Sequence, residues 1–400
     1  MFKNIEYKWY ILLLSCLTIF FGTGLQRYTL PVLFDEISKD LNLSLLQIGT
    51  IWGMDPLGGV FVSLFIGMLI DKFGIKRSVV TISILVGITG MLRGFSSNFI
   101  TLLVIMLLFG LVVSTTPTVF FKVIAVWFEG RNLGMANGIL MAFNHLGGMT
   151  SSMTSATILS PLLNGWRNVI ILFAFPPIIL GFLWLVSYKE DRKPSFNFRN
   201  VNKPSIGEAL AHVIRIKDVW IASIIQAGAA GMFVGVTGYL PIYLRNLGWE
   251  TGIADSSLTI LIGTIAFASI LVPMLSDRFG SRKLLLVPLQ LIVCSILLMF
   301  PFIDSYMLYI LIILFGFFFG GIPPLIISSL VELKEVGSSY AGTAIGLCYT
   351  FAMLGSFISA PLGNSTASIH PALPFVIWGA MVGIVSFGYL FLESSKVHNQ

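Results

Sequence analysis

The sequence predicts an all-α integral membrane protein of twelve transmembrane helices, arranged as two pseudo-symmetric six-helix bundles. Three observations predict it: an apolar composition, twelve stretches long enough to span a bilayer, and a polar segment that occurs twice at matching positions. Of the 400 residues, 56% are hydrophobic and 10% are charged, and the mean hydropathy is +0.92. Soluble globular domains are far more polar, so most of this chain is expected to lie in a lipid bilayer. The remaining polar segments are too short to form a soluble catalytic domain.

Each of the twelve apolar stretches approaches the roughly 20 residues that a helix needs to cross a hydrocarbon core of about 30 Å. Backbone groups in lipid must be satisfied within the segment, so every stretch is predicted to be a helix. The first stretch is longer than the apolar region of a signal peptide and lacks a small-residue cleavage site, so we expect it to remain in the membrane. The stretches begin near Trp9, Leu45, Ser78, Phe99, Leu133, Trp166, Asp218, Asp255, Leu284, Tyr306, Ser338 and Pro371.

A polar loop between two apolar stretches occurs once in each half of the chain. This loop is GMLIDKFGIKR at 67–77 and recurs as PMLSDRFGSRK at 273–283. A second segment, GMANGILMAFNHLGG at 134–148, is similar to GTAIGLCYTFAMLGS at 342–356. Such internal repeats indicate two copies of one structural unit. The predicted domains are a six-helix bundle at 1–187, a basic cytoplasmic linker at 188–217 that contains a helix-like segment, and a second bundle at 218–400.

Basic residues predict the orientation. With a cytoplasmic N-terminus, all but five of the 24 lysines and arginines lie within or near the inner face, as the positive-inside rule requires. The exceptions are Arg27, Lys39, Arg93, Arg167 and Arg245. We therefore expect a monomeric protein of the plasma membrane, the inner membrane of a bacterium, with both termini in the cytoplasm. The net charge of +6 reflects loops beside an anionic leaflet, and no nucleic-acid partner is expected because no folded basic module is present.

The loop at 67–77 resembles the G-x-L-a-D-r-x-G-r-k signature of the major facilitator superfamily, and its degenerate second copy extends the resemblance over essentially the whole chain. The resemblance implies alternating access between two halves, with a solute site near the bilayer midplane at their interface. It also implies that both loops latch the halves and control switching. The residues implied in this gating are Gly67, Asp71, Gly74, Lys76, Arg77, Asp277, Gly280, Arg282 and Lys283. A tight turn with topogenic charges would explain Gly74 and Lys76 equally well.

Ionisable groups inside predicted spans are costly in lipid, so they carry the functional interpretation. At 1.5 Å per residue, Arg27 and Asp55 reach similar depths, and Arg93 and His145 fall in the same zone. Two roles are open for Asp55. It could neutralise Arg27 or Arg93 in an ion pair, or it could accept a proton as a coupling site. A guanidinium can hold a carboxylate through two parallel hydrogen bonds. We expect Arg27 to anchor an anionic substrate and Arg93 to be structural.

Asn144 and His145 interrupt the glycine-rich face of their helix, and we expect both to contact the substrate. His145 is also a candidate proton carrier because histidine titrates near physiological pH, although a lone histidine more often makes a structural hydrogen bond. The second half has Thr237 where the first has Arg27, so the charged residues gather in the first half. We expect the second half to contribute one side of the substrate-binding site, made of Gln226, Phe233 and Tyr349.

These features predict a secondary transporter that moves a small organic anion, coupled to protons or another ion gradient. QRYTLP at 26–31 is similar to the first helix of organic-anion branches of the superfamily, and a single cationic anchor suits a monocarboxylate. A multidrug or other efflux antiporter, a facilitator of the haem or choline type, and a non-transporting membrane sensor remain open. No enzyme and no cofactor are expected, because the sequence has no nucleophile, metal or nucleotide constellation and no Walker loop.

Overall fold

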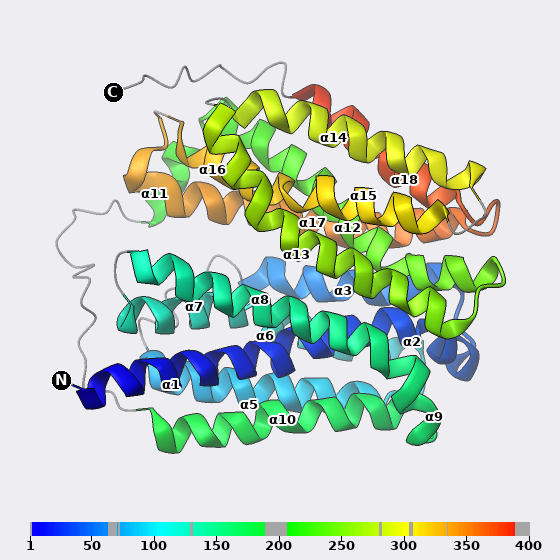
Figure 1. Cartoon of the computed structure of the whole chain (residues 1–400), viewed down its shortest axis with the longest axis horizontal. Coiled ribbons are helices and arrows are strands. Elements are labelled where there is room, and N and C mark those ends of the chain that lie inside the picture. The colour runs from blue at the N-terminus through cyan, green and yellow to red at the C-terminus, as the bar shows by residue number, and fades with distance from the viewer. Residues whose placement is uncertain are drawn as a thin grey trace. The chain divides into compact units, whose positions relative to one another are not determined.

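The computed structural model describes residues 2–62, 70, 73–128, 131–188, 206–279, 282–303, 307–333 and 335–388. Every regular element within these residues is a helix, which confirms the predicted all-α class. The chain divides into two compact units, each of which is described by itself (Figure 1). The first unit comprises Met1–Leu43, Leu57–Val201 and Thr251–Thr259, and the second comprises Ser44–Pro56, Asn202–Glu250 and Ile260–Gln400. The domain boundaries expected at 188 and 217 stay a prediction.

Helices from the first part of the sequence build most of the first unit. In order they are α1 (Phe2–Ile19), the π-helix η1 (Phe20–Leu25), α2 (Gln26–Leu41), α3 (Leu45–Val62), α5 (Ile75–Gly94), α6 (Phe99–Val113), α7 (Thr116–Trp127), α8 (Arg131–Thr154), the π-helix η2 (Ser155–Leu159), α9 (Ser160–Leu162) and α10 (Trp166–Ser187). The first part of α3, up to Pro56, groups with the second unit.

The remaining helices belong mainly to the second unit. They are α11 (Ile206–Val213), α12 (Lys217–Asn246), α13 (Thr251–Phe279), α14 (Arg282–Met299), the short η3 (Phe300–Phe302), α15 (Met307–Gly320), α16 (Ile322–Val331), α17 (Gly337–Thr366) and α18 (Leu373–Ser386). The first turns of α13, up to Thr259, group with the first unit.

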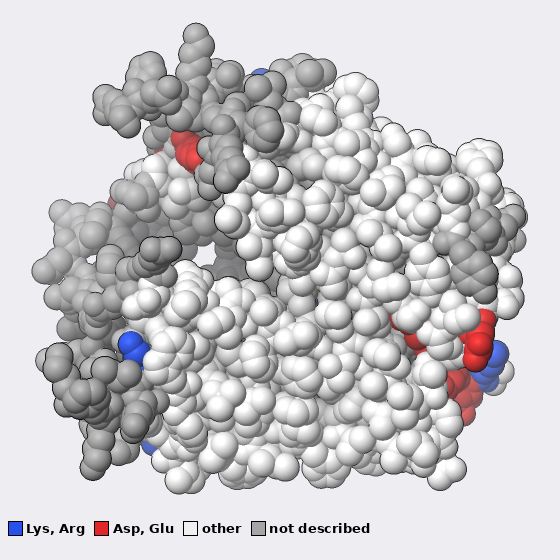
Figure 2. All heavy atoms as spheres, in the orientation of Figure 1, with Lys and Arg blue, Asp and Glu red and all other residues white. Residues whose placement is uncertain are grey.

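The described residues contain ten helical stretches that are long and apolar enough to cross a membrane. The chain is therefore a multi-pass membrane protein. Two predicted spans are not among these ten stretches. α8 is not apolar enough because it carries many polar residues, and α18 is too short with 14 residues. The first stretch runs from Tyr7 to Leu41, and within it the π-helix η1 joins α1 to α2. The number twelve stays a prediction. On the face drawn in Figure 2, the described charged side chains lie at the two ends of the helices.

Two predicted spans are broken at equivalent places, which agrees with a duplicated architecture. α6 gives way to α7 at a turn that precedes Pro117, and α15 gives way to α16 at Gly321, which precedes Pro323. Proline lacks an N–H and is favoured in the first turn of a helix. Each of these prolines therefore starts a new helical segment within the span.

Glycines allow close helix packing in the second unit, where α12 lies along α17 and α18 (Figure 1). Trp378 is fully buried, and a methyl group at Gly235 or Gly363 would overlap its ring. The indole of Trp378 donates to the carbonyl oxygen of Ser359 at 2.9 Å. In lipid, small residues of this kind let helices approach closely and gain van der Waals contact.

The predicted linker contains a helix, α11, as its residue spacing indicated. The His212 ring of α11 stacks on Tyr340 of α17 with ring centroids 4.1 Å apart, and its Nε2 lies 3.0 Å from the carbonyl oxygen of Glu335. α11 therefore packs on the first turns of α17.

Candidate functional site

A π-helical segment interrupts the first membrane span just before Arg27. The segment η1 contains Gly22, Thr23 and Gly24. A π-helical segment shifts the backbone hydrogen bonds by one residue and occurs frequently at functional sites. The hydroxyl oxygen of Thr23 is buried and has no hydrogen-bond partner among the described residues. Arg27 follows in the first turn of α2 and is partly exposed.

α8 packs directly against this interruption. A methyl group at Gly24 would overlap the main-chain oxygen of Asn144, and one at Gly147 would overlap the main-chain oxygen of Phe20 in η1. One turn further along, the hydroxyl oxygens of Thr29 and Ser151 lie 2.6 Å apart. The two glycines therefore allow α8 to lie along η1 and α2 at the level of Arg27.

This packing brings three of the predicted substrate-binding residues onto adjacent helices of the first unit: Arg27 on α2, and Asn144 and His145 on α8. The Oδ1 atom of Asn144 and the Nδ1 atom of His145 are buried, and neither has a hydrogen-bond partner in the described part of the chain. Leaving a buried polar atom unpaired costs about 1–3 kcal/mol. Such atoms call for a water molecule or a ligand.

Arg93 has a different environment, deep inside the first unit. Its guanidinium donates to the carbonyl oxygen of Gln26 at 3.1 Å and to the side-chain oxygen of Gln26 at 2.9 Å. It also lies over the ring of Phe109, 4.0 Å from the ring centroid. These contacts link α5 to α2 and α6, so Arg93 has a structural role in helix packing.

The second unit contains the other predicted site residues. Asp55 on α3 is buried, and so is Gln226 on α12, whose Oε1 has no partner among the residues described. Phe233 stacks on Phe319 with ring centroids 5.1 Å apart and an interplanar angle of 10°. Tyr349 on α17 is 45% exposed. Phe233 is thus engaged in packing between α12 and α15, whereas Tyr349 is only half-buried.

The predicted gating loop is described only in part. Gly74 has a φ of 82°, a left-handed conformation that glycine adopts without a steric penalty, and its carbonyl oxygen accepts from the hydroxyl of Ser78 at 2.8 Å. Lys76 and Arg77 lie in the first turn of α5. Gly74 therefore makes the turn that starts α5. Gly67, Asp71 and Gly280 lie outside the described residues, as do the side chains of Asp277, Arg282 and Lys283.

Sequence reasoning missed several polar residues beside Arg27. Gln26 accepts a hydrogen bond from Arg93, and Ser151 bonds with Thr29. Thr23 has a buried hydroxyl without a partner among the described residues. The run Gly22–Thr23–Gly24 was the available signal, because two glycines in one turn weaken a helix. Asp255 was also missed: it is fully buried, and the hydroxyl of Thr157 donates to it at 3.3 Å.

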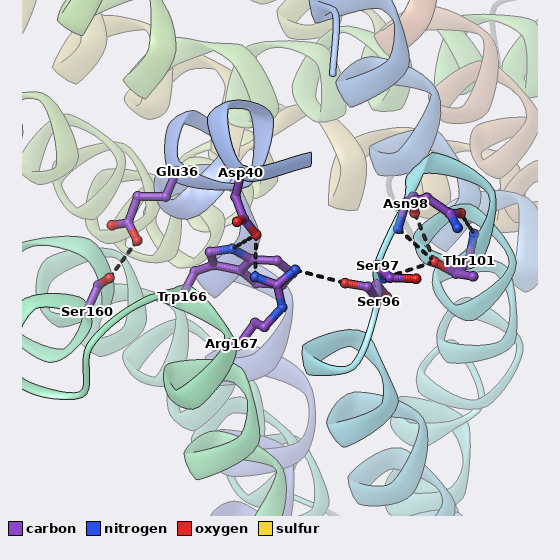
Figure 3. A network of polar contacts seen from close by, with 9 residues as sticks. All are labelled: Glu36, Asp40, Ser96, Ser97, Asn98, Thr101, Ser160, Trp166 and Arg167. Atoms are coloured by element: carbon purple, nitrogen blue, oxygen red, sulfur yellow. Dashed lines mark hydrogen bonds and ion pairs between the residues drawn. The ribbon is translucent and has the colours of Figure 1, made fainter. Parts of the chain in front are cut away.

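A polar network lies at one end of the first unit (Figure 3). The hydroxyl of Ser160 donates to Glu36 at 2.6 Å, and the indole of Trp166 donates to Asp40 at 3.1 Å. Arg167 pairs with Asp40 and donates to the carbonyl oxygen of Ser96 at 3.1 Å. Both members of this ion pair are more than one-third exposed, so the pair contributes at most about 1 kcal/mol. The network holds helix ends together.

The repeats, the helices and the loop signature agree with a comparison against known families. A model of the Major Facilitator Superfamily matches residues 16–360 and also 266–400. The chain belongs to this superfamily. It is a membrane transporter of small solutes and not an enzyme.

Two relatives and one solved structure illustrate the similarity. The chain is 22% identical over 418 residues to a probable sulfoacetate transporter, SauU, of Cupriavidus necator, covering 98% of this chain and 95% of the relative. It is 24% identical over 437 residues to a probable galactarate/D-glucarate transporter, GudP, of Bacillus subtilis, covering 96% and 92%. The fold resembles the crystal structure of the nucleoside transporter NupG, with a TM-score of 0.78 at 13% identity, covering 95% of this chain and 99% of that one.

Proposed function

We propose that the protein moves a small organic anion across the membrane by alternating access, with Arg27 as the cationic anchor. Asn144 and His145 complete the polar side of the site in the first unit. The protein acts in the plasma membrane with both termini in the cytoplasm, and its gating loops control switching.

The observation that carries this proposal is the set of polar groups around Arg27. Arg27 is partly exposed, and α8, which packs at the same level, carries one side-chain amide oxygen and one ring nitrogen without partners among the described residues. An anion bearing a hydroxyl or a second polar group would satisfy both kinds of atom at once. Arg93 is the contrasting case, because its side chain is fully buried inside the first unit.

The relatives support the same chemical class. Both are named as transporters of organic acid anions, sulfoacetate in one case and galactarate or D-glucarate in the other. The chain covers more than nine-tenths of each relative. The proposed substrate therefore stays a small organic anion, and monocarboxylates are one example of that class.

Proton coupling forms the second part of the proposal, with His145 and Asp55 as the groups that carry the proton. Asp55 is buried in a membrane-spanning helix. A carboxylate at such a place is costly and is commonly functional. Binding of a proton together with the anion would reduce the charge that crosses the membrane.

Uptake by proteoliposomes tests the proposal. Acid anions such as sulfoacetate, glucarate and lactate are offered one at a time, each beside its neutral amide as a matched control. We expect at least one anion to accumulate and its amide to be ignored, because the guanidinium recognises the negative charge. Uptake of the amides at equal rates, or of none of the anions, would contradict anion transport.

The coupling is tested in the same vesicles with an inward proton gradient. We expect a protonophore to reduce accumulation of the anion to the equilibrium level. Uptake that is insensitive to collapse of the gradient would remove proton coupling from the proposal and leave anion recognition standing.

A further inference from the structure

The first unit contains a cavity of about 700 Å³ that shares no lining residue with the candidate site. Its walls come from the end of α3, the first half of α5, the end of α6 and the end of α10. Most of the lining side chains are aliphatic, including Leu85, Leu111 and Leu185. The volume is in the range of pockets that hold a whole ligand, and the lining suits an apolar chain.

Two cations lie at one end of this cavity. Lys76 and Arg77 both line it and both belong to the first turn of α5. Within the described residues, neither side chain pairs with an acidic group. The cavity is therefore apolar along most of its length and positively charged at one end.

The dimensions of the cavity match one leaflet of a bilayer. From Lys76 to Leu85 along α5 the distance is about 14 Å at 1.5 Å per residue, close to half of a hydrocarbon core of about 30 Å. Phe73 and Leu85 are 50% and 39% exposed. The cavity thus opens onto exposed apolar side chains, so a lipid can reach it from the membrane.

We infer that this cavity binds an anionic phospholipid, with one acyl chain between α5, α6 and α10 and the phosphate against Lys76 and Arg77. Basic pockets between membrane helices bind anionic lipid headgroups by the same combination of charge and apolar depth. A soluble anion would gain nothing from the aliphatic walls. The inference does not rest on the proposed solute site, although Lys76 and Arg77 also belong to the first gating loop.

Native mass spectrometry of the purified full-length protein tests the inference. The protein is titrated with phosphatidylglycerol, with phosphatidylcholine of identical acyl chains, and with inorganic phosphate. We expect one phosphatidylglycerol to bind with an affinity about 30-fold above that of phosphatidylcholine, from two cations that each contribute about fivefold. The variant K76Q/R77Q should lose this preference.

Two matched controls separate the site from general charge and surface effects. K8Q/R215Q removes two basic residues from the same predicted side and leaves the cavity unchanged, so it should keep the preference. L85W fills the cavity without changing charge and should weaken phosphatidylglycerol binding at least tenfold, whereas I88W, at an exposed neighbour that does not line the cavity, should not. Equal affinity for the two lipids, equal losses in the control variants, or displacement of the lipid by equimolar inorganic phosphate would overturn the inference.

Discussion

The first membrane span and its repeat counterpart α12 differ in one respect that concerns the site. The first span is interrupted by the π-helix η1, after which comes Arg27, whereas α12 is a continuous α-helix from Lys217 to Asn246. In α12 the position equivalent to Arg27 holds Thr237, whose hydroxyl donates to the carbonyl oxygen of Phe233 at 2.9 Å. At this level the first span therefore has a distorted backbone and a charged residue, and α12 has neither.

The same difference separates α8 from its counterpart α17. α8 continues into the π-helix η2, whereas α17 is α-helical over all 30 of its residues. α8 carries Asn144 and His145, whose Oδ1 and Nδ1 atoms have no partner among the described residues, and α17 has Ala352 and Met353 at the equivalent positions. After duplication, both distortions and the polar groups are found in the first unit, and we interpret that unit as the one that recognises the solute.

The largest expected effect on stability comes from closing the space between η1 and α8. Gly24→Ala would place a methyl group on the main-chain oxygen of Asn144, so the helices must separate. We expect a loss of about 3 kcal/mol, at the upper end for overpacking, measured by thermal unfolding in detergent. Gly138→Ala is the matched control on α8, because nothing lies within 4 Å of that position, and it should gain up to about 1 kcal/mol of helix propensity. Equal effects would refute the close packing.

The next effect concerns the buried amides of the two units. Gln26→Leu removes the side-chain oxygen that accepts from Arg93, and we expect the free energy of unfolding to fall by about 2 kcal/mol because the acceptor served a charged group. Gln226→Leu in the second unit removes an oxygen without a partner among the described residues. Its stability should be unchanged or higher. A similar loss in both variants would mean that the two amides have equivalent roles.

A third prediction compares His145 with its counterpart. His145→Asn should reduce the initial rate of anion uptake about tenfold, the effect of losing one polar contact of about 1.4 kcal/mol. Met353→Leu at the equivalent position of α17 should leave the rate within about twofold, because it preserves an apolar side chain of similar volume. The account would be weakened if the methionine variant were the slower one.

The smallest effect is expected at the surface network of Figure 3. Asp40→Asn should cost about 0.5 kcal/mol of stability because its ion pair with Arg167 is largely exposed. The loss should disappear in 1 M salt, where the screening length is about 3 Å. Unfolding midpoints at low and high salt measure it, and a salt-independent loss above about 2 kcal/mol would show that the network is part of the core.

The sequence was sufficient for the helical membrane fold, because lipid imposes hydrophobic length and because duplicated motifs reveal the architecture. It also predicts Arg27 and His145 as site residues, since charged and ionisable groups are rare in apolar spans, and their roles stay a prediction. It could not locate the π-helix at Thr23, because that hydrogen-bond shift depends on contact with α8, a helix more than 100 residues away in the chain. Nor could it assign the partner of Arg93, since Gln26 carries no charge to attract notice.

The central claim is that the solute anion is held by the first unit through Arg27. Isothermal titration of a transported anion into Arg27→Ala and into its repeat counterpart Thr237→Ala tests it most directly. We predict that the arginine variant binds about 100-fold more weakly, from two charge-assisted hydrogen bonds of about 1.5 kcal/mol each, and that the threonine variant stays within about twofold of the unmodified protein. Equal affinities in the two variants, or a larger loss in Thr237→Ala, would contradict the claim.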